Sequence, residues 1–168
     1  MAELTLRERK QPCLLDRLTD DEPGATQEGR DKRVMSMSQI RRSVLRDLEW
    51  LFNTSAKWTD DELKDFPHVA SSVLNYGVPD LCGLTSSSVN PIEVERAVER
   101  AVRRFEPRIL SNSLSVIADA DADEVGTNAV RFEIRGMLWA QPLPEQMYVK
   151  TDVDLETGTC KVQETPYG

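Results

Sequence analysis

Residues 90–108 read NPIEVERAVERAVRRFEPR, and this stretch decides how the chain folds. It predicts a helix with Asn90 as its N-cap, a proline at the first helical position, and Glu93 reaching back to complete a capping box. The apolar residues recur at spacings of three and four and form one stripe: Val94, Ala97, Val98, Ala101, Val102 and Phe105. Because Pro107 disfavours helical backbone at Glu106, we expect the helix to end there. The pattern then changes from helical to alternating, so this stretch joins two halves of the chain.

The region before this helix predicts further helices. Residues 36–53 combine a capping box with an apolar stripe of Met37, Ile40, Val44, Leu48, Leu51 and Phe52. Residues 59–66 predict a short helix that is closed by Pro67. Residues 69–76 predict a third helical segment, for which Gly77 is a natural end.

From residue 109 onward the pattern is typical of strands. Apolar and polar residues alternate over residues 114–118, where Ile117 breaks the alternation, over 130–138 and over 147–155, and a short last strand, 159–163, follows a turn at 156–158. Consecutive strands with short connections imply an antiparallel sheet. We therefore predict an α+β fold in which helices pack on one face of a small antiparallel β-sheet.

The first 35 residues differ in composition from the rest. They are polar and mixed in charge, so we predict a flexible N-terminal arm over residues 1–35 and the folded domain over residues 36–168. One amphipathic island stands out in the arm, formed by Leu14, Leu15, Asp16, Arg17 and Leu18. We interpret it as a docking segment for a partner; the alternative is a helix that folds back on its own domain.

The length, charge, cysteine content and apolar runs of the chain restrict the class of protein. The 168 residues suit one domain with a tail. A formal charge of −8 argues against nucleic-acid binding, since no basic stripe could neutralise phosphates. The three cysteines are too widely spaced for a disulfide framework or a metal site, which indicates a reducing compartment. With no signal-peptide core and no long apolar run, we expect a cytoplasmic protein without direct membrane insertion.

No constellation of catalytic or metal-binding residues emerges. Residues 119–130 superficially resemble a calcium loop, but the glycine and the distal glutamate are missing, so we expect a solvated hairpin tip. His68 is the one histidine, and we interpret it as a surface or cap residue. Glu106 with Asp152 or Asp154 could form a glycosidase pair, but alternation places both aspartates on an exposed strand face. We expect no catalytic residue, no metal site and no cofactor.

The tripeptide Glu106-Pro107-Arg108 is different, because proline fixes the backbone between two opposite charges at a helix-to-strand corner. One interpretation is an intrachain salt bridge that locks the corner. The other is a rigid fork of two charges presented to a partner. The residues alone leave both open, and we expect the fork.

Several segments together resemble a known family. They are residues 14–18 with 21–23, residues 46–54 (RDLEWLFNT), residues 72–81 (SVLNYGVPDL) and residues 105–108 (FEPR). In order and spacing they are similar to the TssE family of type VI secretion baseplate subunits, relatives of the small wedge proteins of contractile phage tails.

The resemblance implies a structural role. Members of this family join the baseplate wedge with the TssF and TssG subunits, contact the hub, and begin the contractile sheath. The family's signature for baseplate contacts carries over onto Glu106, Pro107 and Arg108. We therefore expect a non-enzymatic subunit at the baseplate docked on the inner membrane, whose antiparallel sheet offers sheath subunits an edge to pair with. The alternatives are a peptidoglycan-cleaving, lysozyme-like hydrolase and a generic cytoplasmic adaptor.

Overall fold

The computed structural model describes residues 12–19, 23–24, 35–85, 88–119, 128–140 and 143–165. Its helical elements are α1 (Leu14–Leu18), α2 (Met37–Phe52), α3 (Pro67–Ala70), the 3₁₀ turn η3 (Val73–Asn75) and α4 (Pro91–Phe105). Its strands are β1 (Ser115–Asp119), β2 (Ala129–Leu138), β3 (Glu145–Asp154) and β4 (Cys160–Glu164). The predicted α+β fold is confirmed.

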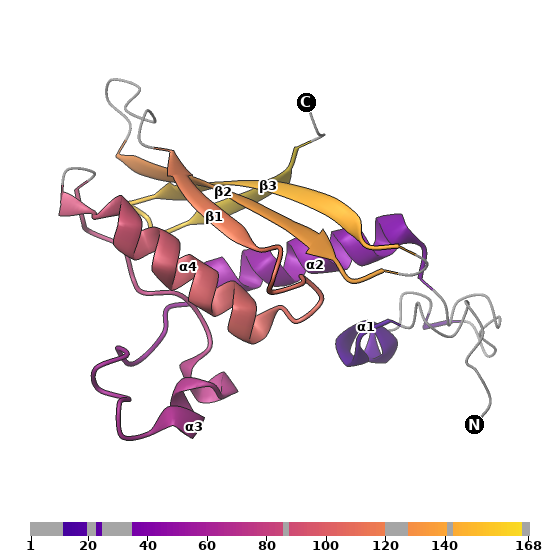
Figure 1. Cartoon of the computed structure of the whole chain (residues 1–168), viewed down its shortest axis with the longest axis horizontal. Helices are drawn as coiled ribbons and strands as arrows, with labels where there is room; N and C mark the ends of the chain where they lie inside the picture. The colour runs from indigo at the N-terminus through magenta and orange to yellow at the C-terminus, as the bar shows by residue number, and fades with distance from the viewer. Residues whose placement is uncertain are drawn as a thin grey trace.

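The four described strands form one antiparallel sheet in the order β1-β2-β3-β4 (Figure 1). Each strand therefore pairs with its neighbour in the sequence. In the central pair, Phe132 lies opposite Thr151 and Ile134 lies opposite Val149. All four side chains are buried, so the register places the apolar positions of both strands on one face.

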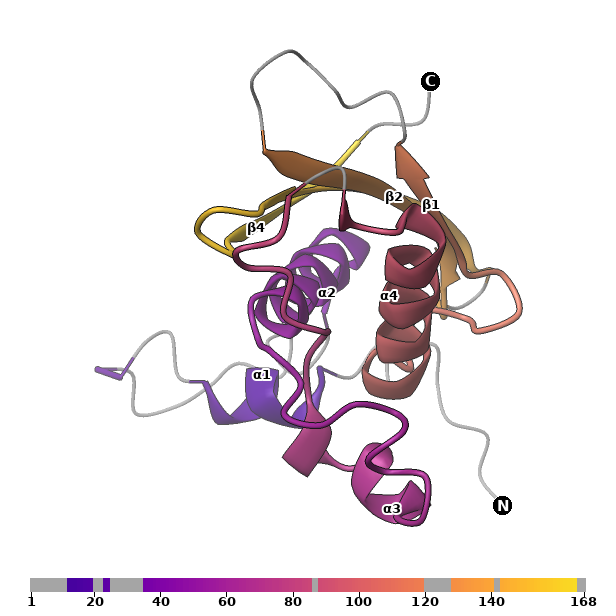
Figure 2. The ribbon, with the colours of Figure 1, turned by 90° about the vertical axis from the view of Figure 1, so that its left-hand side faces the viewer.

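Helices α2 and α4 lie side by side on that face and form the second layer of the domain (Figure 2). The core lies between the two layers. Its fully buried side chains include Val44, Leu48 and Leu51 from α2, Val102 from α4, and Ile134, Leu138, Met147 and Val149 from the sheet.

Both long helices begin as the sequence predicts. The Ser36 hydroxyl accepts a bond from the Gln39 N–H, and the Gln39 side chain accepts from the Ser36 N–H, which completes the capping box of α2. In α4 the Asn90 side chain accepts from the Ile92 N–H at 3.1 Å. Glu93 reaches back, but it accepts from the side-chain amide of Asn90. The cap of α4 is therefore a variant of the predicted box.

The chain between α2 and α4 is less helical than predicted. Residues 59–66 form successive turns, although Thr59 and Glu62 make the hydrogen bonds of a capping box. Pro67 begins α3 instead of closing a helix, and residues 69–76 are divided between α3 and η3. Helix propensity and capping residues favoured a helix in this excursion of the chain between α2 and α4. The excursion does not lie over the sheet, however, so a helix there would have no apolar surface against which to bury one face.

Gly77 holds the end of this excursion close to the domain. Its φ of 125° is in the region that only glycine adopts readily, and an added Cβ would lie 2.2 Å from the Thr54 carbonyl oxygen. The close approach is required because Ser55 and Val78 form a parallel bridge. The glycine therefore allows the chain to return beside the C-terminus of α2.

One buried hydroxyl in the sheet has no hydrogen-bond partner among the described residues. Thr151 is 1% exposed, and its Oγ1 lies in the core between the sheet and the helices. We expect Thr151→Val to raise the free energy of unfolding by about 1 kcal/mol, because an unsatisfied buried hydroxyl is removed at constant volume. Urea unfolding measures the change.

Thr54→Val is the matched control, since the Thr54 hydroxyl donates to the Trp50 carbonyl at 2.7 Å. That substitution should lower stability. A loss of stability in Thr151→Val as large as in the control would contradict the assignment.

Candidate functional site

The site begins where α4 ends. Glu106 is the C-cap residue, with φ −120° and ψ 75°, and Pro107 follows it, as the sequence predicts. The chain then turns onto the sheet, where the Trp139 N–H donates to the Arg108 carbonyl at 2.7 Å and Ile109 bridges to Leu138. The corner is therefore fixed to the end of β2.

Glu106 and Arg108 are paired with each other across this corner. One carboxylate oxygen of Glu106 accepts from the backbone N–H of Arg108 at 3.1 Å and from its Nε at 2.7 Å, and the other accepts from Nη2. The Glu106 side chain is only 3% exposed. The intrachain salt bridge is thus present, and a partner would meet a closed pair instead of two open charges.

Helix α2 completes the environment of Arg108. The guanidinium also bonds to the Asp47 carboxylate, and its Nη1 donates to the Ser43 hydroxyl at 3.1 Å. Burial by itself would lower the pKa of Arg108, but the hydrogen bonds and charges of Glu106 and then Asp47 outweigh it and raise the pKa. Arg108 is therefore a permanent cation that joins α2 to the end of α4.

The ion pairs continue to α1. Arg46 bonds to Asp47 and, at 2.8 Å, to Asp16, whose side chain is 4% exposed. Asp16, Arg46, Asp47, Arg108 and Glu106 thus form a chain of alternating charges, which we call the ion-pair chain. It connects α1, α2 and the corner.

The link to α1 keeps its charge at neutral pH. Burial alone would raise the pKa of Asp16, but hydrogen bonds from Cys13 and Arg46 lower it below its ordinary value. A carboxyl group whose pKa is lower in the folded state adds stability above its unfolded pKa and loses it as the pH falls through the folded one. The tie is therefore lost only in acid.

The predicted docking segment is a short helix held against its own domain, as in the second interpretation given above. Asp16 points inward, but Leu14 and Leu18 are 69% and 74% exposed, and Leu15 and Arg17 are also exposed. The helix has no buried residue. Its apolar side therefore remains available at the surface.

A cavity of about 370 Å³ lies between α1 and the corner. Its lining includes Leu15 of α1 with the N-cap Cys13, Trp50 of α2, and Phe105 of α4 with the nearby Pro107. Trp50 is half exposed, and the Arg46 guanidinium lies 5.0 Å from its ring centroid. The island and the tripeptide, separate in the sequence, thus share one surface.

The two edges of the sheet differ. At β1, the Ala118 N–H donates outward to the Glu95 carboxylate of α4 at 2.8 Å, so a side chain already occupies this edge. At the other edge, the N–H groups of Asp154 and Thr165 donate to Thr159 and Tyr148, both at 3.0 Å. Hydrogen-bonded and non-hydrogen-bonded pairs alternate along an antiparallel ladder. These two bonds therefore determine which residues of β4 direct their N–H and C=O toward β3 and which direct them away from it. Lys161 and Gln163 bond to β3, and Cys160, Val162 and Glu164 face outward.

Side chains of α2 and the residue after it occupy both ends of this edge. The Asn53 side chain donates to the Cys160 carbonyl at 2.8 Å and accepts from its N–H at 2.9 Å. Arg41 bonds to the Glu164 carboxylate and to the Gln146 carbonyl. Between them, the N–H and C=O of Val162 face away from β3 and take no part in the β3–β4 ladder.

Sequence reasoning missed the residues that complete these arrangements. Asp47, Ser43 and Asn53 lie about 60 or more positions from the groups they bind at the corner and on β4, and Arg46 lies 30 positions from Asp16. Arg46 and Asp47 belong to the quoted segment RDLEWLFNT, which marks them as notable. Nothing in one sequence, however, assigns a partner at that separation.

The described residues contain no cluster of three or more side chains suited to a metal ion, and no described helix could cross a membrane. Glu106 lies in the helical layer and is bound to Arg108, whereas Asp152 pairs with Arg131 on the exposed face of the sheet. These two carboxylates therefore do not form a glycosidase pair. Residues 120–127, most of the suspected calcium loop, lie outside the described residues.

Residues 38–143 match the family described as baseplate wedge protein gp25, and the chain belongs to this family. It is the family of TssE, the type VI secretion baseplate subunit, which confirms the resemblance drawn from the sequence. No curated protein and no solved structure matches the chain. Family membership supports a structural role in association with other baseplate components.

Because Glu106 is buried, its replacement should affect the stability of the fold more than the loss of an exposed ion pair would. We expect Glu106→Ala to lower the free energy of unfolding by about 3 kcal/mol, because it leaves Arg108 partly buried without its main partner. Chemical denaturation measures the loss.

Glu99→Ala, on the same helix, is the control. It removes an exposed ion pair to Arg103 at 2.6 Å, and we expect a cost of about 0.5 kcal/mol or less. Equal stabilities for the two variants would show that the corner is not a structural lock.

Proposed function

We propose that this chain is a structural subunit of a type VI secretion baseplate that joins the wedge and initiates polymerisation of the sheath. The observation that carries the proposal is the ion-pair chain, which fixes α1 and the Glu106-Pro107-Arg108 corner relative to each other. Two regions distant in the sequence thereby form a single preorganised surface. Binding to such a surface requires little ordering of the chain.

The surface has the composition of a protein interface. Leu14, Leu18 and Trp50 are exposed apolar side chains, and Leu15, Trp50 and Pro107 line the cavity between α1 and the corner. An exposed apolar cluster next to a satisfied charge network is typical of an interface core with a polar rim. We assign this surface to the wedge subunits TssF and TssG, with the hub spike protein as a further neighbour, at a baseplate docked on the cytoplasmic side of the inner membrane.

Within this proposal, Glu106 and Arg108 act mainly by holding the corner in shape. The outward part of Arg108 and the ring of Pro107 are what a wedge subunit would touch, since Glu106 is enclosed. The ion-pair chain also couples α1 to the corner through Arg46 and Asp47. A partner that displaces one end would disturb the other.

The sheath contact is assigned to the edge of β4. An added strand could use the outward N–H and C=O of Val162, with Asn53 limiting the pairing at one end and Arg41 at the other. The edge of β1 is less suited, because Glu95 occupies the Ala118 N–H. Sheath initiation would therefore use the C-terminal edge of the sheet.

The peptidoglycan-cleaving alternative has little support in the site. General acid chemistry would need a free carboxyl group beside a second one, and Glu106 is already bound to Arg108. His68 is exposed on the short helix α3. We propose that the protein is not an enzyme.

The wedge assignment predicts that the leucines of α1 contribute to binding and not to folding. Replacing both Leu14 and Leu18 by Asp should weaken binding to co-expressed TssF and TssG about tenfold or more, because interface anchors are lost. The melting temperature should change little, since both side chains are exposed. Interferometry and thermal melts measure the two effects.

Val73→Asp provides the control for this variant. Val73 is 81% exposed on η3 and does not line the cavity between α1 and the corner, so its replacement should leave wedge binding unchanged. A Leu14 and Leu18 variant that binds the wedge like the wild type would refute the assignment of α1.

The edge assignment predicts a selective effect of Val162→Pro. Because the Val162 N–H faces outward, proline removes no bond of the β3–β4 ladder but blocks an added strand. We expect initiation of sheath assembly, followed by electron microscopy, to be lost while wedge binding persists.

Gln163→Pro is the comparison, since Gln163 bonds inward to Lys150 of β3. That variant should lose stability itself. Normal sheath initiation by a folded Val162→Pro variant would exclude this edge as the template.

A further inference from the structure

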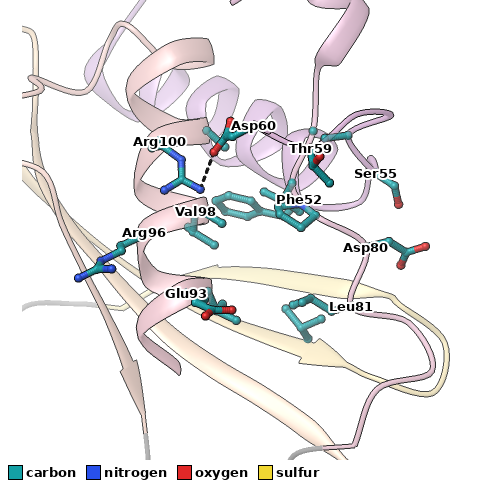
Figure 3. Close-up of a pocket in the computed structure, with 18 of the residues that line it drawn as sticks. Phe52, Ser55, Thr59, Asp60, Asp80, Leu81, Glu93, Arg96, Val98 and Arg100 are labelled. Atoms are coloured by element: carbon teal, nitrogen blue, oxygen red, sulfur yellow. Dashed lines mark ion pairs between the residues drawn. The ribbon is translucent and has the colours of Figure 1, made fainter. Parts of the chain in front are cut away.

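A second cavity, larger than the one beside α1, is a groove that the wedge surface and the sheet edge do not use. It has a volume of about 790 Å³ and lies between α4 and the returning segment 77–81 (Figure 3). The core side chains Phe52, Val98 and Phe132 line it but are at most 5% exposed. Its accessible apolar surface comes from partly exposed side chains above them, such as Leu81, Leu84 and Ala97.

The groove is long enough for a secondary-structure element. On the α4 side its lining extends from Glu93 to Phe105, a little over three helical turns and about 18 Å. Leu84, which is 40% exposed, lies in the lining of the groove. A single small ligand would leave much of this length unfilled.

The two walls carry opposite net charges. The α4 wall has Arg96, Arg100 and Arg104 against Glu93, and the opposite wall has Asp60, Asp61 and Asp80 against Lys57. Arg100 and Asp60 join the walls at 3.0 Å, with both side chains more than half exposed (Figure 3). Arg104 bonds to the neutral carbonyl of Ala70, and Asp61 makes no side-chain hydrogen bond or ion pair with the described residues. The positive charge of Arg104 and the negative charge of Asp61 thus remain without an ion-pair partner among the described residues.

The backbone of the returning segment does not favour an added strand. The N–H and C=O of Val78 are both bonded to the segment beside it, at Thr54 and Ala56. The next residue, Pro79, has no N–H to donate. A helix satisfies its own backbone hydrogen bonds and needs only side-chain contacts, so it suits this groove better.

We propose that the groove binds an amphipathic helix of another baseplate wedge component. Apolar side chains of that helix would lie on Leu81, Leu84 and Ala97, with acidic residues along the α4 wall and basic residues along the wall of Asp60 and Asp61. Because the Arg100–Asp60 pair is exposed, it contributes little to stability and can exchange for pairs with the incoming helix. The choice of a wedge component rests on the proposed function.

Two charge-swapped variants test the proposal without changing net charge. Asp60→Arg combined with Arg100→Asp keeps a pair across the groove but exchanges its charges, which removes the net positive charge of one wall and the net negative charge of the other. Glu99→Arg combined with Arg103→Glu swaps an ion pair elsewhere on α4, between residues outside the groove lining. We expect the first to weaken binding to purified TssF and TssG about tenfold or more, and the second to leave it nearly unchanged.

A third variant fills the groove. Ala97 lines it and is partly exposed, so Ala97→Phe should block the incoming helix while the melting temperature stays the same or rises. A photo-crosslinking residue in place of Leu84 then identifies the occupant. We expect a crosslink to an amphipathic helix of TssF or TssG.

The outcomes separate this inference from the proposed function. If the wild type does not bind the wedge subunits, both fall. If the Leu14 and Leu18 variant loses binding but the groove variants bind normally, the proposed function stands and the groove inference is overturned. A crosslink to a sheath subunit, to a second copy of this chain or to an extended segment would also overturn it.

Discussion

The guanidinium of Arg108 is the point on which the arrangement of this domain depends. It lies where α4 gives way to the sheet, and carboxylates from two different helices hold it. Without Pro107, the helix could continue through Glu106, and the Glu106 carboxylate would no longer lie beside the Arg108 guanidinium. Without Asp47, α2 would lose its tie to the corner. The fixed backbone of Pro107 and the two ion pairs of Arg108 thus determine how the helical layer is positioned relative to the sheet.

The same network explains how a small, weakly packed helix can keep a defined position. Helix α1 buries no residue, so apolar contact alone would not hold it. Its Asp16 side chain, which is 4% exposed, is the last member of the ion-pair chain. Its leucines therefore stay at the surface while the helix remains oriented, a combination that suits recognition by another subunit better than an unattached arm would.

Local features of the fold could be predicted from the sequence, but its long-range partners could not. The caps of α2 and α4, their stripes, the strands and the turn at Gly158 depend on neighbouring residues and follow from spacing. The excursion through α3 was predicted as more helical than it is, because turn-forming sequences and helix caps share residues. Asn53 at the edge of β4 and Asp47 at the corner act across the fold, and one sequence holds no signal for such contacts.

The burial of Glu106 also determines how variants of the corner should be interpreted. Its removal would weaken the fold and any interface built on it together, so loss of assembly in such a variant would not identify a point of contact. Exposed positions separate the two effects, because they can change binding while the core stays intact. Leu14 and Leu18 serve this purpose at the corner, and Val162 serves it at the sheet edge through its outward N–H. The groove offers the same separation through an ion pair that can be reversed without loss of charge.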